Sequence, residues 1–315
     1  KGARELQKRG RMKAKWLSRQ QELKKYLCPD SDTGLRIPGD MPLTSVIIPV
    51  YNNLKLTVKC LNSIYSAGTS VPFEVILVDD ASKENIRSLA RDFPGLRVVR
   101  NEANLGFLRT ANRGAEEARG EYLLFLNNDT EVITPRWLEE MVMYAQQERV
   151  GCVGVKLLYP DNTIQHAGIG FGYLTLAAHM HKNFPVGHPG YMGRLVYAQD
   201  VYAVTAACLM VRKSVYDEVN GLDESFAVAF NDVDFCVRVR EAGYTNVFTP
   251  FAQLYHYESK SRGLDESPAK RKRFESEVKR FQQRWAKQLA AGDPCLNPNF
   301  DLMKEDFTFD IKPLE

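Results

Sequence analysis

Short apolar runs alternate with segments of helical periodicity through the first half of the chain. The runs are rich in β-branched residues and bounded by turn residues, as strands buried on both faces of a sheet should be. The helical segments end near glycine or begin at a capping residue or a proline, with Ser82 and Pro135 as two such starts. The predicted strands are 44–50, 73–78, 96–100 and 121–126, and the predicted helices are 54–67, 82–92, 108–119 and 135–148.

This alternation predicts an α/β fold with a doubly wound, mostly parallel sheet and flanking helices. In such sheets ligands bind at the carboxyl ends of the strands. The pattern is less regular after about residue 150, and the glycine-containing stretch 172–199 is expected to be a long loop. The second half is predicted to contain strands at 153–159, 162–171, 201–211, 245–249 and 252–257, and helices at 214–218, 233–241 and 268–289.

Residues 1–27 differ in character from the rest of the chain. They are predicted to form a basic helix with ten Lys and Arg and two Glu, followed by a linker to residue 34. Because the whole chain carries a net charge of +3 and this segment +8, the remainder carries −5. A mildly acidic body argues against nucleic-acid binding. The helix is compatible with a solvated linker, a packing arm or contact with an anionic membrane surface.

Six scattered cysteines without a C-x-x-C pair favour reduced thiols over a disulfide framework or a zinc site, which indicates a cytoplasmic protein. The longest uncharged apolar run, 201–211, is far shorter than the roughly 20 residues that span a bilayer. No signal peptide is visible, and the first residue is Lys rather than Met. We therefore expect a cytoplasmic segment of a longer protein, located at the inner face of the membrane if residues 1–27 contact lipid.

The loop after the first predicted strand reads Pro49-Val50-Tyr51-Asn52-Asn53. A dinucleotide-binding fold or a nucleotidyltransferase would have a glycine-rich loop here, because glycine lets backbone amides approach a diphosphate. Without such a loop, a metal ion is the remaining way to hold a diphosphate. Asn127-Asn128-Asp129-Thr130, after the fourth strand, offers oxygen ligands that suit magnesium or manganese. The alternative for this motif is a polar turn that ends a strand.

Further polar residues have both a functional and a structural interpretation. Asp79 could accept a hydrogen bond from a base imide, and Asp80 could help to cap the following helix. Asp232 lies at the start of a predicted helix, where it is either a general base or a first-turn carboxylate favoured by the helix dipole. His256 lies between apolar residues on a predicted strand, where the alternative to a metal ligand is a satisfied core histidine.

Several motifs follow one another in order along the chain. They are Tyr51-Asn52-Asn53 after the strand at 44–50, Val78-Asp79-Asp80-Ala81-Ser82, Asn104-Leu105-Gly106-Phe107, Ala111-Asn112-Arg113-Gly114, Glu121 to Asp129, Gly221-Leu222-Asp223-Glu224-Ser225-Phe226, Asn231-Asp232-Val233-Asp234 and the segment from His256 to Gly263. In this order they resemble the family 2 glycosyltransferases, an inverting family with the GT-A fold. The resemblance covers about residues 43–263. The tail 293–299 is similar to that of bacterial members that build O-antigen and rhamnose-rich polysaccharides.

The resemblance implies a single GT-A catalytic domain over about 41–263, with a nucleotide-binding half to about 130 and an acceptor half after it. Residues 264–315 are then a C-terminal helix and tail packed on this domain. The implied catalytic residue is Asp232, and the implied ligands of a divalent metal, manganese or magnesium, are Asp129 and His256. The implied nucleotide-binding residues are Pro49, Tyr51, Asn52, Asp79, Asp80, Asn104, Arg113 and Asn128, and the implied acceptor or secondary residues are Asp234, His181 and Arg262.

The implied reaction moves a hexose or deoxyhexose from a UDP- or dTDP-sugar to a hydroxyl of a growing bacterial cell-surface glycan, free or lipid-linked. Two departures from the family pattern stand out. The D-x-D motif reads Asn127-Asn128-Asp129, which loses one carboxylate and lowers the expected metal affinity. The E-D pair reads Asn231-Asp232, which keeps the aspartate. The alternative function is an inactive nucleotide-sugar or glycan-binding domain within a multi-domain polysaccharide synthase.

Overall fold

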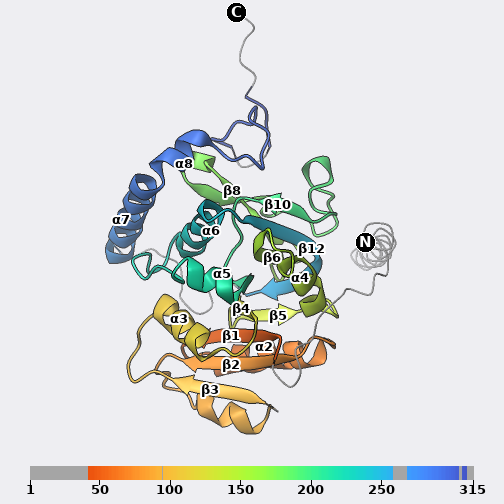
Figure 1. Cartoon of the computed structure of the whole chain (residues 1–315), viewed down its shortest axis with the longest axis vertical. Helices are drawn as coiled ribbons and strands as arrows, with labels where there is room; N and C mark the ends of the chain where they lie inside the picture. Colours follow the sequence, from red (N-terminus) through yellow and green to blue (C-terminus); the bar gives the residue numbers. More distant parts are fainter. Residues whose placement is uncertain (1–41, 94, 258–267, 305–306, 311–315) are drawn as a thin grey trace, which may run out of the picture.

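The computed structural model describes residues 42–93, 95–257, 268–304 and 307–310 (Figure 1). A mixed sheet has the strand order β10-β12-β6-β11-β4-β1-β2-β3, with β5 paired to β12 and β7 to β6, and a small second sheet pairs β8 with β9. The predicted α/β class is confirmed. The strands are β1 (Thr44–Val50), β2 (Phe73–Asp79), β3 (Leu96–Arg100), β4 (Tyr122–Leu126), β5 (Thr130–Val132), β6 (Val150–Leu158), β7 (Ile164–His166), β8 (Ile169–Phe171), β9 (Ala177–His179), β10 (Gln199–Val201), β11 (Cys208–Arg212) and β12 (Thr245–His256).

The strands β1 to β4 form a parallel part of the sheet. β1 pairs in parallel with both β2 and β4, and β2 pairs in parallel with β3. The predicted bounds 44–50 and 96–100 are those of β1 and β3, because each is a short apolar run ended by turn residues. The α-helices of this half are α2 (Leu54–Ser66), α3 (Phe107–Glu117) and α4 (Trp137–Ala145).

Two of the predicted helix starts are wrong. The stretch 82–92 contains only a 3₁₀ helix, η1 (Ile86–Arg91), and Ser82 does not cap it. The Ser82 hydroxyl instead accepts the amide of Asn52 at 2.8 Å, which ties the loop after β1 to the loop after β2. Pro135 precedes α4 by two residues and does not occupy its first position. A tertiary contact thus takes the place of the Ser82 cap, and a turn that includes Pro135 precedes α4, so the local cap signal does not set the helix start in either case.

The segment 201–211, predicted as one strand, is divided in the structure. β10 ends at Val201 on the sheet edge, and β11 begins at Cys208, antiparallel to both β4 and β6. The connection crosses over β6, where a Cβ added to Gly154 would lie 2.5 Å from the Cβ of Val204. A connection that crosses the sheet is buried and needs apolar residues, as a strand does. The apolar pattern of 201–211 therefore does not distinguish one continuous strand from two strands joined by a buried connection.

Residues 245–249 and 252–257, predicted as two strands, belong almost entirely to the single strand β12. Its parallel register with β6 shifts between Thr249 and Gln253. Pro250 lies in this interval and lacks the N–H group that a regular ladder requires. The proline therefore marks an irregularity within one strand rather than the end of a strand.

The helices of the second half lie mainly on one side of the sheet, and Figure 1 shows α7 running beside α6. The predicted helix 268–289 is interrupted at Trp285, which separates α7 from α8. The ring of Phe281 on α7 lies 5.9 Å from that of Phe171 on β8, so the C-terminal region packs on the rest of the domain. The helical elements here are α5 (Lys213–Glu218), α6 (Asn231–Glu241), α7 (Pro268–Arg284) and α8 (Ala286–Ala291), with η2 (Tyr173–Thr175) and η3 (Tyr191–Gly193) inside the predicted long loop.

Two hydrophobic clusters make up the core, and the helices differ in which cluster they join. Leu61 of α2 and Trp137 of α4 belong to one cluster, and Ala111 of α3 belongs to the other. A Cβ added to Gly114 would lie 2.4 Å from Cγ2 of Ile47, so glycine allows α3 to approach β1 closely. No helix in the described ranges is long and apolar enough to cross a membrane. The free cysteines of these ranges are Cys60, Cys152, Cys208, Cys236 and Cys295.

Candidate active site

The ends of β4 and β12 meet at one side of the sheet. After β4 the chain turns and forms β5, which pairs antiparallel with β12 so that Thr130 lies opposite His256. This pairing places Asp129 Oδ1 3.2 Å from His256 Nε2, and the Tyr257 amide donates to the Asp129 carbonyl at 2.8 Å. The two side chains are almost completely buried. The structure therefore brings together the two residues that the sequence proposes as metal ligands.

A third side chain determines which way the His256 ring faces. Gln165 Oε1 lies 2.8 Å from His256 Nδ1, and because an amide oxygen only accepts, Nδ1 carries the proton. Nε2 lies 3.2 Å from both Asn127 Nδ2 and Asp129 Oδ1, so it can donate to the carboxylate or, as an unprotonated nitrogen, accept from the amide. When Nε2 carries no proton, this nitrogen and the Asp129 carboxylate offer two ligand atoms to a cation. We call Asn127, Asp129, Gln165 and His256 the strand-end cluster.

The strand-end cluster fits a divalent ion that takes part of its coordination from a ligand. Adjacent ligands of an ion with bonds of about 2.1 Å lie roughly 3 Å apart, close to the 3.2 Å between Asp129 Oδ1 and His256 Nε2. Within the ranges that the structure describes, no group of three or more His, Cys, Asp or Glu side chains could hold a metal. Such a two-residue site suits magnesium or manganese, which keep water or substrate phosphate as further ligands.

Asp232 lies next to the strand-end cluster, separated from it by one dipeptide. The amide of Ala206 donates to Asp232 Oδ2 at 3.2 Å, and the carbonyl of Ala207 accepts the amide of Asn127 at 3.0 Å. The structure corrects the predicted start of the helix, because α6 includes Asp232 in its first turn. Its carboxylate also accepts the amide of Val233 at 2.9 Å, so its direction is fixed on both oxygens.

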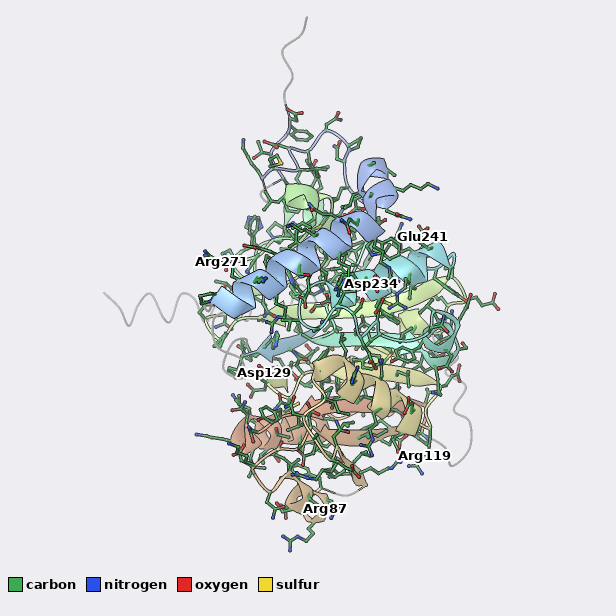
Figure 2. The ribbon with its side chains drawn as sticks, turned by 90° about the vertical axis from the view of Figure 1, so that its left-hand side faces the viewer. Arg87, Arg119, Asp129, Asp234, Glu241 and Arg271 are labelled. Atoms are coloured by element: carbon green, nitrogen blue, oxygen red, sulfur yellow. The ribbon has the colours of Figure 1, made fainter. Side chains whose placement is uncertain are left out.

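Asp234 occupies a different environment from Asp232. It is fully buried and accepts from Arg238 Nε at 2.9 Å and from Trp285 Nε1 at 3.1 Å, while Arg284 Nε lies 3.3 Å from it. Burial raises the pKa of this carboxyl, although the two arginines oppose the shift. Figure 2 shows Asp234 beside α7, away from Asp129. These contacts support a structural role for Asp234, linking α6 to α7.

Asp79 is fully buried at the end of β2. Its Oδ1 accepts the amide of Ser82 at 2.9 Å, and its Oδ2 forms an ion pair with Arg100 of β3. Binding a base imide, the role expected from the sequence, would require the carboxylate to give up one of these partners. The described contacts thus support Asp79 as a residue that shapes the nucleotide-side loop.

Asp80 holds the loop that enters α3. Its carboxylate accepts from the amides of Leu105 and Gly106, at 2.8 Å and 2.9 Å, and from Asn101 Nδ2 at 2.8 Å. Arg113 joins the same network by donating to Asn101 Oδ1 at 2.6 Å. These contacts do not include the cap to the following helical segment that the sequence suggests. Asp80 and Arg113 therefore lie in one network, in which Asp80 orders the loop before α3.

The remaining predicted nucleotide-binding residues differ in exposure. Tyr51 is 47% exposed directly after β1, and Asn104 is also exposed. Pro49 is buried within β1. Asn52 accepts a backbone amide from the loop after β2 at 2.8 Å, and Asn128 donates to a threonine of α2 at 3.0 Å. Tyr51 and Asn104 can contact a ligand directly, whereas the other three support the surrounding backbone.

His181 is only 1% exposed, which does not fit the acceptor contact expected from the sequence. Its Nε2 accepts the amide of Tyr191 at 3.1 Å, its ring packs on that of Phe307 at 4.3 Å, and burial lowers its pKa to about 3. These contacts support a packing role. Arg262, the other predicted acceptor residue, lies outside the described residues.

Two contributors to the site were not apparent from the sequence. Gln165 belongs to β7 and reaches His256 only because β6 pairs with both β7 and β12. The Ala206–Ala207 dipeptide acts through its backbone, so its side chains give no sign of a role. A glutamine within the largely apolar stretch 164–171 was the only signal available in the sequence.

The chain is similar to known proteins over most of its length. Protein y4gI of Sinorhizobium fredii is 43% identical over 272 residues, which are 84% of this chain and 30% of that protein. The O-antigen biosynthesis protein RfbC of Myxococcus xanthus is 33% identical over 270 residues, 84% of this chain and 21% of that protein. The chain thus spans less than a third of the length of these relatives.

The fold has solved counterparts. The crystal structure of GalNAc-T7 with UDP, GalNAc and Mn2+ matches with a TM-score of 0.59 and 15% identity, over 79% of this chain and 50% of that one. At this identity the match supports the fold alone, and that fold is GT-A. The family described as Glycosyl transferase family 2 matches residues 45–219, more than half of the chain. The chain therefore belongs to glycosyl transferase family 2.

Proposed function

We propose that this chain is an inverting glycosyltransferase. It moves a hexose or deoxyhexose from a UDP- or dTDP-sugar to a hydroxyl of a growing bacterial cell-surface polysaccharide. The name of the Myxococcus relative supports the polysaccharide, and the UDP in the GalNAc-T7 structure supports the donor class. The observation that carries the proposal is that Asp232 lies beside the strand-end cluster. The Ala206–Ala207 dipeptide lies between them and is hydrogen-bonded to Asp232 on one side and to Asn127 on the other.

Asp232 is the proposed base of a single displacement. The acceptor oxygen forms a bond to the anomeric carbon while the bond from that carbon to the diphosphate oxygen breaks on the opposite face. Asp232 accepts the hydroxyl proton, a contribution typically worth about a hundred- to ten-thousand-fold in rate. The amides of Ala206 and Val233 hold its two oxygens in place. Attack opposite the leaving group inverts the anomeric configuration.

Asp129 and His256 would hold a manganese or magnesium ion. Such an ion, when bound, neutralises the charge that grows on the leaving diphosphate. Gln165, bonded to Nδ1, keeps Nε2 of His256 facing Asp129. Asn127 supplies an amide where the full family motif has a carboxylate, so we expect weaker metal affinity than a full D-x-D motif provides.

The proposed catalytic domain covers about 41–263, with 264–315 as a C-terminal addition that supports it. We propose that the acceptor glycan is free or lipid-linked and that transfer occurs in the cytoplasm, at the inner face of the membrane if residues 1–27 contact lipid. Contact with that membrane through residues 1–27 rests on the charge of that segment, which lies outside the described residues.

The decisive test combines donor binding with turnover. A panel of nucleotide sugars is screened for thermal stabilisation in the presence of Mn2+, since a ligand at 100 times its Kd adds about 2.7 kcal/mol to the free energy of unfolding. The stabilising donor is then assayed for transfer to short acceptors and for slow hydrolysis. Transfer with inversion supports the proposal. Stabilisation without transfer or hydrolysis would instead support an inactive nucleotide-sugar-binding domain.

A further inference from the structure

One face of α7 contacts the segment that leads into α6 and the first turn of α6. The residues of this face are spaced three or four apart, as neighbours on one side of a helix are. Figure 2 shows α7 crossing the molecule beside Asp234. The residues of this face are Phe274, Glu277, Phe281 and Arg284, and Trp285 follows directly after α7.

Glu277 is the centre of this contact. It is 3% exposed, and its two carboxylate oxygens accept consecutive backbone amides, Val228 to Oε1 at 3.3 Å and Ala229 to Oε2 at 2.8 Å. The carbonyl of Val228 in turn accepts from Asn231 Nδ2 at 3.0 Å, which closes a turn onto the first residue of α6. A buried carboxylate with two adjacent amides fixes both the position and the direction of that backbone.

Phe230, the residue between this turn and α6, has an unusual conformation. Its φ is +63°, a left-handed value that is rare for a bulky side chain, and no side chain caps the helix here. Its ring packs on Phe281 at a centroid distance of 4.8 Å and on Phe274 at 6.0 Å. Because such a conformation persists only where its surroundings enforce it, α7 is a main determinant of how the chain enters α6.

The contact continues on the other side of Asp232. Asp234 is bound by Arg284 of the same α7 face and by Trp285, the residue directly after α7. Residues two apart on a helix point about 200° from each other, so Asp234 faces α7 while Asp232 faces the Ala206 amide. α7 thus holds the backbone before and after Asp232 without touching its carboxylate.

We propose that Glu277 is a positioning residue for Asp232, setting the backbone from which this carboxylate reaches the acceptor hydroxyl. The inference rests on the proposed function, in which Asp232 is the base. A misplacement of the reacting groups by about 1 Å can cost a hundredfold in rate, so a carboxylate that orders residues 228–229 affects turnover without contacting the substrate. Both Glu277 and Asp232 lie outside the matched family range, 45–219.

The test uses the full chain with Glu277→Gln, which replaces one accepting oxygen by an NH₂ group, and Glu277→Asp, which keeps the charge but shortens its reach. Glu275→Gln, an exposed glutamate of the same helix, is the matched control. For each variant we measure kcat, donor KM, melting temperature and hydrogen exchange of residues 226–232. We expect kcat to fall about tenfold or more in both Glu277 variants, donor KM to stay within about twofold, and exchange at residues 228–229 to rise. Glu275→Gln should change none of these quantities.

The outcomes separate this inference from the function on which it rests. An active wild-type chain with unchanged kcat in both Glu277 variants overturns the positioning role alone. So does a parallel loss of kcat, donor affinity and melting temperature, which is the signature of general destabilisation. If Glu277→Gln fails to fold, the kcat of Glu277→Asp decides by the same criteria. A wild-type chain that neither transfers nor hydrolyses any donor overturns the proposed function and this inference with it.

Discussion

Two sets of aspartates at the strand ends of this protein differ in how fully the protein itself satisfies them. After β2, Asp79 and Asp80 accept hydrogen bonds from backbone amides, an arginine and an asparagine. After β4, the Asp129 carboxylate lies 3.2 Å from Nε2 of His256, a ring nitrogen of the kind that binds metals when it is unprotonated. A carboxylate with several donors orders a loop, whereas one beside an imidazole nitrogen can share a metal ion with it.

The comparison shows that residue type alone does not locate the chemistry. Asp79 ends one buried strand and Asp129 follows another, and both belong to motifs of the family pattern. Their partners separate them, and those partners come from β3 in one case and β12 in the other. The same contrast recurs within one helical turn, where Asp234 is enclosed by α7 and Asp232 lies on the side of the strand-end cluster.

The largest expected effect separates Asp129 from Asp79. Asp129→Asn should lower kcat roughly a thousandfold if the ion it helps to hold contributes about 4 kcal/mol to transition-state stabilisation, and EDTA should reproduce that loss in the wild-type chain. Asp79→Asn should keep kcat within a few-fold and lower the free energy of unfolding by about 1 kcal/mol, because its partner Arg100 is partly exposed. Steady-state kinetics and denaturant titration measure both. Full activity in EDTA would show that the metal assignment is wrong.

The second expected effect separates Asp232 from Asp234. Asp232→Asn should lower kcat by about a hundredfold or more, with melting temperature and donor affinity nearly unchanged, because asparagine cannot accept the hydroxyl proton. Asp234→Asn should have a milder effect on kcat but lower the free energy of unfolding by about 1–3 kcal/mol, since it weakens buried bonds to Arg238 and Trp285. If Asp234→Asn causes the large loss of kcat and Asp232→Asn the mild one, the assignment of Asp232 as the base is wrong.

A smaller effect tests whether Gln165 orients His256. Gln165→Leu removes the acceptor for His256 Nδ1–H, so the ring loses its fixed tautomer and direction. The Kd for Mn2+, measured by calorimetry or electron paramagnetic resonance, should rise about tenfold, as is typical when such a partner of a metal ligand is lost. Gln283→Leu, at an exposed position on α7, is the control. An unchanged Kd for Mn2+ in Gln165→Leu would show that Gln165 does not orient His256 for metal binding.

The smallest effect concerns a buried charge away from the candidate active site. Lys156 on β6 is fully buried, its Nζ donates to the Leu195 carbonyl at 2.9 Å, and burial lowers its pKa to about 7. Between that value and the ordinary 10.5, the unfolded chain holds one more proton than the folded chain, so stability rises with pH. The free energy of unfolding should gain about 1 kcal/mol from pH 7 to 8, and Lys156→Met should abolish that gain. An identical pH profile in the variant would contradict the buried, neutral lysine.

The fold of the first half could be predicted closely, because its signals are local. The apolar runs of β1 and β3 end at turn residues. The helix α2 connects β1 to its parallel neighbour β2, which pairs in turn with β3. The second half could be predicted less well. Its crossing at 202–207 is as apolar as a strand, and β12 continues through Pro250 because β6 pairs with it on both sides of the proline.

The sequence by itself determined the family motifs, the alternating strands and helices, and the candidates Asp129, Asp232 and His256. Tertiary structure alone decided which of the aspartates are satisfied and which are available for chemistry. It did so because the deciding partners, His256 for Asp129 and Arg284 for Asp234 among them, come from strands and helices far away in the chain. A hydrogen bond depends on distance and direction in space, and the order of residues along the chain specifies neither until the sheet and its helices have assembled.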